Sequence, residues 1–180
     1  MENYNVKYLC SAAMIAAVYT ALSLLFAPFS FGPIQCRLSE MLVILPAFIP
    51  AAIPGVTIGC LLTNILGGCA VADIIFGTLA TFIGAVLTRM LTKPMVDEAI
   101  SSGRPSWRFR ILAVIPPILS NTIIVPFVLK YAYGYGDALY FMFLTVGIGE
   151  IIAIGIIGNV FMTAICRTKL TYVLKNQALI

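Results

Sequence analysis

Long apolar stretches constrain this sequence more than any other feature does. Several of them run for about 19 residues or more with few charges, and a helix that crosses a bilayer needs roughly 20 such residues. Of the 180 residues, 61% are apolar and 10% are charged, whereas a soluble domain carries about a quarter charged residues. The composition excludes a disordered chain, a secreted disulfide scaffold and an ordinary cytosolic enzyme. It predicts an all-α integral membrane protein, with one transmembrane domain over residues 1–180.

Six membrane-spanning helices can be located from the apolar pattern. Residues 38–70 form an apolar region with Pro46, Pro50 and Pro54 near its middle. These prolines favour a break into two short helices, each about 24 Å long and slightly shorter than the hydrocarbon layer. The other four spans are longer and cover residues 8–26, 72–91, 111–129 and 138–166.

The basic residues predict the orientation of these spans. With six spans, both ends of the chain lie on the same side of the membrane. If that side is the cytoplasm, Arg37 and Lys130 are the only two of the 11 basic residues on the outer side. Because Lys and Arg favour cytoplasmic loops, we expect both termini in the cytoplasm.

The acidic residues are distributed differently, because four of the seven fall in the outer half: Glu40, Asp73, Asp137 and Glu150. Glu150 lies about 18 Å below the outer end of the last span. A carboxylate at that depth is costly unless it is paired or faces a polar cavity, and it is therefore a candidate functional group. A structural ion pair, or a protonated acid bonded to a backbone carbonyl, is the simpler alternative. The glycines at 147 and 149 favour a ligand or another helix beside the carboxylate.

Other polar residues could line the same outward-facing cavity. Asn121 and Asn64 could contact a ligand or form interhelical hydrogen bonds, and Tyr140 could stack on a planar ligand or belong to an aromatic belt. The complete set of candidate binding residues is Glu150, Asn121, Asn64, Glu40, Arg37, Asp73 and Tyr140. Arg37 and Glu40 could instead pair at a helix start, and Asp73 could be a helix cap. Such a net-negative cavity suits a neutral or cationic flat heterocycle with several N–H donors. The sequence has no histidine, and we expect neither a metal nor a cofactor.

Small residues mark one face of the first span, at Ala12, Ala13, Ala16 and Ala17. Alanines four residues apart allow close helix approach, either within the chain or to another subunit. The sequence has no G-x-x-x-x-G-K-[ST] phosphate loop, so hydrolysis of ATP by that route is excluded. If the protein transports a ligand, the energy would therefore come from a partner.

Four segments resemble the QueT family. They are the run Gly32-Pro33-Ile34-Gln35-Cys36-Arg37-Leu38-Ser39-Glu40, the stretch from Pro54 to Asn64, the run Asp73-Ile74-Ile75-Phe76-Gly77-Thr78, and Gly147-x-Gly149-Glu150. The family looks like the substrate-binding S components of energy-coupling-factor (ECF) transporters of the bacterial plasma membrane. The resemblance implies a six-helix bundle that is not itself an enzyme. It also implies partners, namely a transmembrane T subunit and two ATPase subunits.

The resemblance further implies a substrate and residue roles. The expected substrates are queuosine precursors or queuine, which are 7-deazaguanines. Glu150 could accept the N1–H and 2-amino groups of such a ligand, and Glu40 or Asp73 could pair with its side-chain amine. Ala12, Ala13, Ala16 and Ala17 would dock on the T subunit.

Other functions are compatible with parts of the pattern. An S component for thiamine fits a net-negative site, whereas the carboxylate of biotin fits it poorly. An intramembrane enzyme would need a catalytic pair that is not evident without histidine, and a passive scaffold would not explain carboxylates at depth. We expect no nucleic-acid partner.

Overall fold

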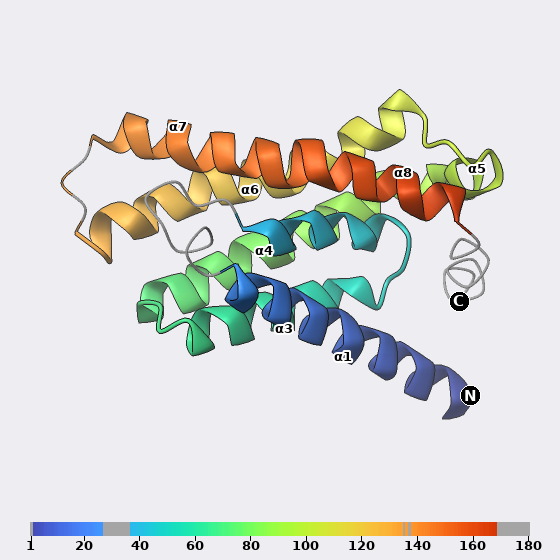
Figure 1. Cartoon of the computed structure of the whole chain (residues 1–180), viewed down its shortest axis with the longest axis horizontal. Helices are drawn as coiled ribbons and strands as arrows, with labels where there is room; N and C mark the ends of the chain where they lie inside the picture. Colours follow the sequence, from blue (N-terminus) through green and yellow to red (C-terminus); the bar gives the residue numbers. More distant parts are fainter. Residues whose placement is uncertain (1, 27–36, 135, 137, 169–180) are drawn as a thin grey trace.

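The computed structural model describes residues 2–26, 37–134, 136 and 138–168, and within these ranges the chain is helical and contains no strand (Figure 1). The elements are α1 (Glu2–Leu25), η1 (Leu38–Ala47), α3 (Ala52–Leu66), α4 (Val71–Thr92), η2 (Lys93–Met95), α5 (Val96–Ser101), α6 (Trp107–Tyr131), α7 (Leu139–Glu150), η3 (Ile151–Gly158) and α8 (Asn159–Arg167). The element η1 is a 3₁₀ helix, and η3 is a π-helical stretch that joins α7 and α8 into one long helix.

Helices occupy all six predicted positions in the described chain. Four are long and apolar enough to cross a membrane: Asn5–Leu25, Val71–Ser101, Trp107–Tyr131 and Leu139–Arg167. The other two, η1 and α3, are apolar but only 10 and 15 residues long. The predicted break between two short helices is confirmed, because residues 48–51 form a turn between them. The number of helices that cross the membrane, and the side on which the termini lie, stay predictions.

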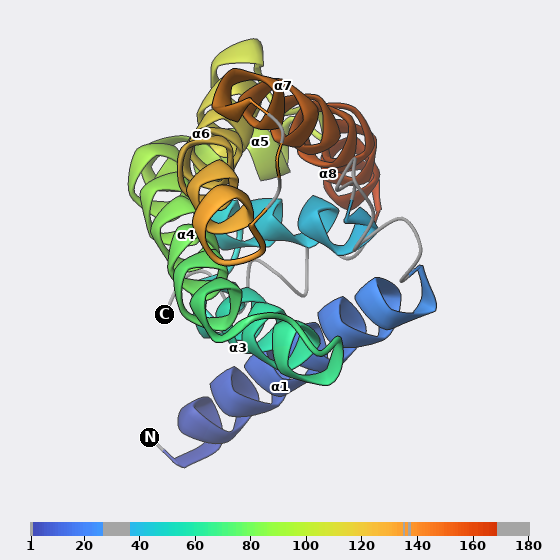
Figure 2. The ribbon, with the colours of Figure 1, turned by 90° about the vertical axis from the view of Figure 1, so that its left-hand side faces the viewer.

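The short helix η1 lies at the centre of the bundle, as the end-on view shows (Figure 2). It packs against α1, α4 and η3, and eight of its ten residues are buried. Its last turn is closed by Arg89, whose guanidinium donates 3.3 Å hydrogen bonds to the carbonyl oxygens of Ala47 and Phe48. Carbonyls at a helix end need such partners when water is excluded. The bundle therefore surrounds a buried segment, which Arg89 caps.

Helix α1 approaches α3 closely along a line of small residues. A Cβ atom added at Gly59 would lie 2.7 Å from Tyr19 Cβ, and one added at Gly55 would lie 2.9 Å from Ile15 Cβ. Ala16 is buried in this contact, and Thr20 Oγ1 donates a 3.2 Å hydrogen bond to the carbonyl oxygen of Gly59. Glycines on α3 thus permit the packing that brings Tyr19 into the interior.

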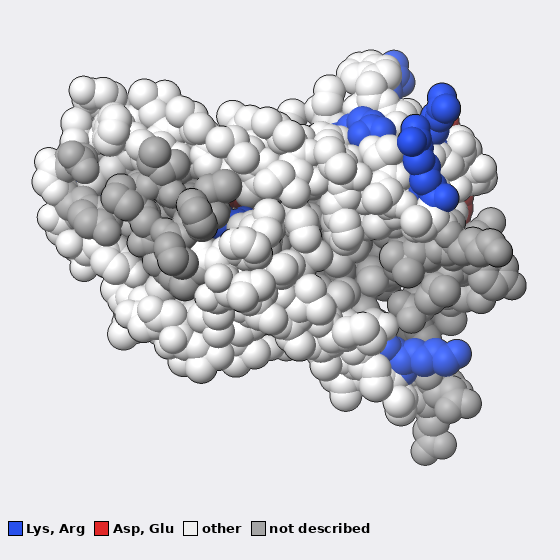
Figure 3. All heavy atoms as spheres, in the orientation of Figure 1, with Lys and Arg blue, Asp and Glu red and all other residues white. Residues whose placement is uncertain are grey.

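Charged side chains gather at one end of the molecule, on the right in Figure 3, where α1 begins and α8 ends. The basic residues at this end are Lys7, Arg89, Lys93, Arg104, Arg108, Arg110 and Arg167. The middle of the face in Figure 3 is uncharged, except at a small opening where basic and acidic atoms are visible. The molecule therefore has one basic end and an apolar flank, with charged groups in its interior.

Candidate ligand-binding site

Four side chains form a group that we name the arginine cluster: Arg37, Asn64 and Asp73, which are buried, and Tyr133, which is partly exposed. Arg37 Nη1 donates a 2.8 Å hydrogen bond to Asn64 Oδ1, and Nη2 lies 3.7 Å from Asp73 Oδ2. The Tyr133 hydroxyl donates to that same Asp73 oxygen over 3.1 Å. In the arginine cluster, the charge of the guanidinium is matched by one carboxylate that has a further donor of its own.

The turn between α3 and α4 assembles half of the arginine cluster. Asn64 lies in the last turn of α3 and Asp73 in the first turn of α4, and residues 67–70 connect them. Gly68 adopts a φ of +68°, which glycine reaches without the steric cost that a Cβ would impose. The tight turn allows Asn64 Nδ2 to donate a 3.3 Å hydrogen bond to the backbone oxygen of Asp73.

Tyr133 closes the arginine cluster from the chain that follows α6. Its hydroxyl oxygen accepts a 3.1 Å hydrogen bond from the backbone N–H of Ala70. Partial burial, together with the nearby charge of Asp73, raises the pKa of the Tyr133 hydroxyl above its ordinary value. The hydroxyl therefore stays protonated at neutral pH and remains a donor to Asp73.

A second buried group, which we name the carboxylate cluster, consists of Tyr19, Glu40, Asn121 and Glu150. The Tyr19 hydroxyl donates to Glu40 Oε1. Asn121 Nδ2 donates to Glu40 Oε2 over 3.4 Å and to Glu150 Oε1 over 3.1 Å. The four residues come from α1, η1, α6 and α7 respectively, so only the assembled bundle brings them together.

Hydrogen-bond donors are scarce in the carboxylate cluster. One amide nitrogen serves both carboxylates, and Glu150 Oε2 is buried with no hydrogen-bond partner among the described residues. The Glu150 side chain is only 8% exposed. An acceptor that is buried without a donor costs about 1–3 kcal/mol, and more when it is charged. The carboxylate cluster therefore has acceptor capacity that a ligand with N–H donors or a positive charge could use.

Members of both clusters line a single cavity, namely Arg37 and Asp73 from the arginine cluster and Glu40, Asn121 and Glu150 from the carboxylate cluster, and Cys60, Gly77 and Thr81 also line it. The space left between the side chains accommodates little more than a water molecule, so a larger ligand requires the side chains to move apart. Gly77 makes part of this space, because a Cβ atom there would lie 2.8 Å from Asp73 Oδ1. The cavity is polar at its centre and is set inside an apolar bundle.

Six of the seven binding residues predicted from the sequence meet in this cavity or beside it: Glu150, Asn121, Asn64, Glu40, Arg37 and Asp73. Tyr140, the seventh, is 72% exposed near the start of α7 and does not line the cavity. Asp137 and the residues 32–36 of the first family-like segment lie outside the described residues. Arg37 pairs with Asp73 from another helix, rather than acting only at the start of its own.

Sequence reasoning missed Tyr19 and did not single out Tyr133. Tyr19 continues the buried face of α1 that contains Ala12 and Ala16, and Ser23 extends that face by one further turn. A buried face that changes from alanine to hydroxyl-bearing residues was a readable signal for a polar site. No such signal marked Tyr133, because other tyrosines lie next to it in the sequence after α6 and nothing distinguishes it from them.

The four alanines of α1 that the sequence singled out differ in burial. Ala12 and Ala16 are each 4% exposed and pack inside the chain, whereas Ala13 and Ala17 are exposed. Docking on a partner subunit stays a prediction, and the exposed pair is the part of the face that a partner could reach.

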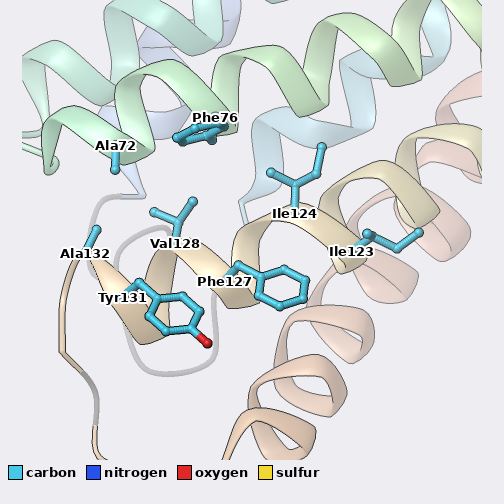
Figure 4. A pocket seen from close by; sticks show the side chains of 8 residues that line it. All are labelled: Ala72, Phe76, Ile123, Ile124, Phe127, Val128, Tyr131 and Ala132. Carbon is cyan, nitrogen blue, oxygen red and sulfur yellow. The ribbon is translucent and has the colours of Figure 1, made fainter.

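A larger groove lies between α4 and α6, away from the polar cavity (Figure 4). Its volume is about 500 Å³, and its lining is almost entirely apolar, with Phe76, Phe127 and Tyr131 as its aromatic members. It lacks the donors and acceptors that would orient a polar heterocycle. The polar cavity is therefore the stronger candidate for a ligand site.

Comparison with known proteins identifies the family. Residues 9–167 match the sequence model of the family described as QueT transporter. The chain belongs to the QueT transporter family. A curated relative, "Queuosine precursor transporter QueT" from Lactococcus lactis subsp. cremoris (strain MG1363), is 31% identical over 125 residues, which cover 68% of this chain and 73% of the relative. No solved structure matches this chain.

Membership of the QueT family gives the buried polar residues a context. The family match extends from α1 to the end of α8 and includes every described member of both clusters. A transport protein with four helices long and apolar enough to span a bilayer is a membrane protein. Buried charges in such a protein are costly, and they mark a substrate pathway more often than a packing core.

Proposed function

We propose that this chain captures a queuosine precursor or queuine in the bacterial plasma membrane, as the S component of an ECF transporter. The observation that carries the proposal is the carboxylate cluster, in which Glu40 and Glu150 share one amide donor and Glu150 Oε2 has no partner in the described chain. The name of the Lactococcus lactis relative, a queuosine precursor transporter, supports the choice of ligand. Transport is the function, and the chain is not proposed to be an enzyme.

A 7-deazaguanine offers the groups that the carboxylate cluster lacks. Its N1–H and 2-amino group lie on one edge and can donate two parallel hydrogen bonds to a carboxylate. We assign that edge to Glu150, which lines the cavity and whose Oε2 has no hydrogen-bond partner in the described chain. Asn121 would then help to orient the ring, and the arginine cluster would bound the other side of the ligand.

The proposed topology has six spans with both termini in the cytoplasm. Support comes from the basic end of the molecule, because Lys7, Arg104 and Arg167 lie on segments that the topology assigns to the cytoplasmic side (Figure 3). The buried helix η1 and the short helix α3 would count as two of the six spans.

Equilibrium binding to the detergent-purified chain tests the ligand. The panel is queuine, the aminomethyl and cyano 7-deazaguanines, guanine and thiamine. We expect a 7-deazaguanine to bind at least a hundredfold more tightly than thiamine, and we expect Glu150→Gln to lose most of that binding. Glu98→Gln is the matched control, because Glu98 is an exposed acid on α5. If thiamine alone binds, the proposed 7-deazaguanine is wrong and the ligand is a vitamin. If Glu150→Gln keeps its affinity for the ligand, Glu150 is not part of the binding site.

Energy is proposed to come from a T subunit and two ATPase subunits, which dock on the exposed side of α1. Ala17→Trp should prevent co-purification with these partners and leave ligand binding intact, because Ala17 is exposed. Ala16→Trp is the comparison variant, and it should destabilise the chain itself because Ala16 packs against α3. Normal assembly of Ala17→Trp with the partners would place the docking surface elsewhere.

A further inference from the structure

The charges around the polar cavity do not balance. The charged groups that face the cavity are Arg37 at the start of η1, Glu40 on η1, Asp73 on α4 and Glu150 at the end of α7. The other titratable groups there are Tyr19 on α1 and Cys60 on α3, which are neutral in their ordinary protonated forms. Arg37 pairs with Asp73. One cation therefore faces three carboxylates in the described chain, and the cavity would carry a net charge of −2 if all three acids were ionised.

Two of these carboxylates, those of Glu40 and Glu150, are close neighbours. An oxygen of Glu40 and an oxygen of Glu150 are both hydrogen-bonded to the same nitrogen, Asn121 Nδ2. Both side chains are buried, at 2% and 8% exposure, so water screens their repulsion poorly. Two carboxylates held this close in a dry site do not both ionise readily, and one shared proton relieves the repulsion.

The position of the unpartnered oxygen agrees with a bound proton. An unpartnered neutral hydroxyl is less costly in a buried site than an unpartnered anionic oxygen. Glu150 Oε2 is such an oxygen, whereas both oxygens of Glu40 accept a hydrogen bond. We propose that the Glu40–Glu150 pair holds one proton without ligand and exchanges it for the positive charge of a cationic ligand, so that the cavity selects an amine-bearing 7-deazaguanine over a neutral one.

The exchange conserves charge and breaks no covalent bond of the ligand. When the ligand's ammonium group enters, the proton on the carboxyl pair leaves to the bulk solvent, Glu150 accepts the ring edge and the ammonium group donates to Glu40. A neutral nitrile ligand brings no charge, so the pair keeps its proton, now on Glu40, and Glu150 accepts the ring edge as a carboxylate. The choice of a 7-deazaguanine as the ligand in this inference rests on the proposed function.

Calorimetric titration in buffers of different ionisation heat tests the exchange. Binding of the aminomethyl ligand near pH 7 should release about one proton, and the affinity should rise by up to about tenfold per pH unit wherever the ligand-free pair holds its proton. The sign follows from release of the proton on binding, since a lower pH opposes that release. Binding of the cyano ligand should release no proton. The Glu98→Gln variant should still release a proton when it binds the aminomethyl ligand, whereas the Glu150→Gln and Glu40→Gln variants should not. That result would assign the proton to the Glu40–Glu150 pair. Equal release with both ligands, or none with the aminomethyl ligand, would overturn the inference and leave the proposed function standing.

Infrared spectroscopy separates this inference from the identity of the ligand. The ligand-free chain should show the carbonyl stretch of a buried protonated carboxyl group. That band should disappear in both Glu40→Gln and Glu150→Gln, because the remaining carboxylate no longer has a charged neighbour. If the band behaves in this way and no 7-deazaguanine binds, the proton site stands and the proposed ligand fails. Absence of the band from the unmodified chain would overturn the proton site whatever the ligand proves to be.

Discussion

The arginine cluster and the carboxylate cluster lie beside the same cavity but differ in how their charges are compensated. In the arginine cluster, Asp73 faces a guanidinium and a tyrosine hydroxyl, and the Arg37 side chain also donates to Asn64. In the carboxylate cluster, two acids depend on one amide and one phenol. The acids of the two clusters are all buried, with Asp73 and Glu40 at 2% and Glu150 at 8% exposure, so burial of the acids does not distinguish the clusters.

The comparison separates polar groups that stabilise the fold from polar groups that await a ligand. A compensated buried pair becomes costly when one partner is removed, because the other is left as an unpaired charge. An uncompensated pair behaves differently, because removal of one acid leaves no buried cation unpaired and removes the neighbour that disfavours ionisation of the other acid. Removal of an acid from the arginine cluster should therefore lower the stability of the fold. Removal of an acid from the carboxylate cluster should lower ligand affinity and leave stability unchanged or higher.

The largest expected effect is on stability, in the arginine cluster. Asp73→Asn removes the carboxylate opposite Arg37, and both side chains are buried, at 2% and 9% exposure. We expect the free energy of unfolding to fall by about 3–5 kcal/mol. Thermal unfolding of the detergent-purified variant measures the change, with Glu98→Gln as control. An unchanged unfolding temperature would mean that the Arg37–Asp73 pair contributes nothing to the fold.

The second effect is on affinity, in the carboxylate cluster. Glu150→Gln removes one carboxyl group of the pair that shares a proton, and it replaces one of two acceptor oxygens with an NH₂ donor. We expect ligand affinity to fall by about 2 kcal/mol, roughly thirtyfold, while the unfolding temperature of the ligand-free chain stays level or rises. Binding and unfolding are measured on the same preparation. A fall in stability equal to that of Asp73→Asn would erase the distinction between the clusters.

A smaller effect comes from filling the space that Gly77 leaves. The Cβ atom of Gly77→Ala would lie 2.8 Å from Asp73 Oδ1 and 3.3 Å from Asn64 Nδ2, so the Asp73 carboxylate must shift away from its position beside Arg37. We expect a loss of about 1 kcal/mol in unfolding free energy. Gly147→Ala is the matched helical control, because its Cβ would meet Thr122 Cγ2 at an ordinary 3.4 Å. Equal stability of the two variants would show that Asp73 can move without cost.

The smallest effect is expected at Tyr133. Tyr133→Phe removes one donor to Asp73 and the acceptor for the Ala70 N–H, but Tyr133 is 37% exposed, so water can replace part of both interactions. We expect a loss of about 0.5 kcal/mol in unfolding free energy, with little change in ligand affinity at equilibrium. A large loss of affinity would instead make Tyr133 a ligand contact and would join the two clusters into one site.

The sequence was sufficient to predict the positions of the helices, because bilayer thickness and proline chemistry leave few alternatives. It also identified Glu150, Asn121 and Glu40 as unusual, since polar residues at depth are costly wherever the chain folds. The sequence could not predict that these residues bond to one another. Asn121 lies 81 residues after Glu40, and only the packing of α6 on η1 makes the two side chains neighbours. Nor could the sequence predict which alanines of α1 are buried and which are exposed, because that depends on how closely the glycines of α3 let α1 approach.

The central position of η1 has a consequence for how the protein is made. A ten-residue segment is shorter than the hydrocarbon layer, and its last carbonyls depend on Arg89 from another helix. Such a segment is poorly suited to enter a bilayer as an independent helix, whereas the four longer helices are well suited to it. The longer helices would insert first and η1 would settle among them afterwards. Glu40 would then reach Glu150 in the last stage of assembly, and a chain that failed to complete that stage would be inserted in the membrane but unable to hold its ligand.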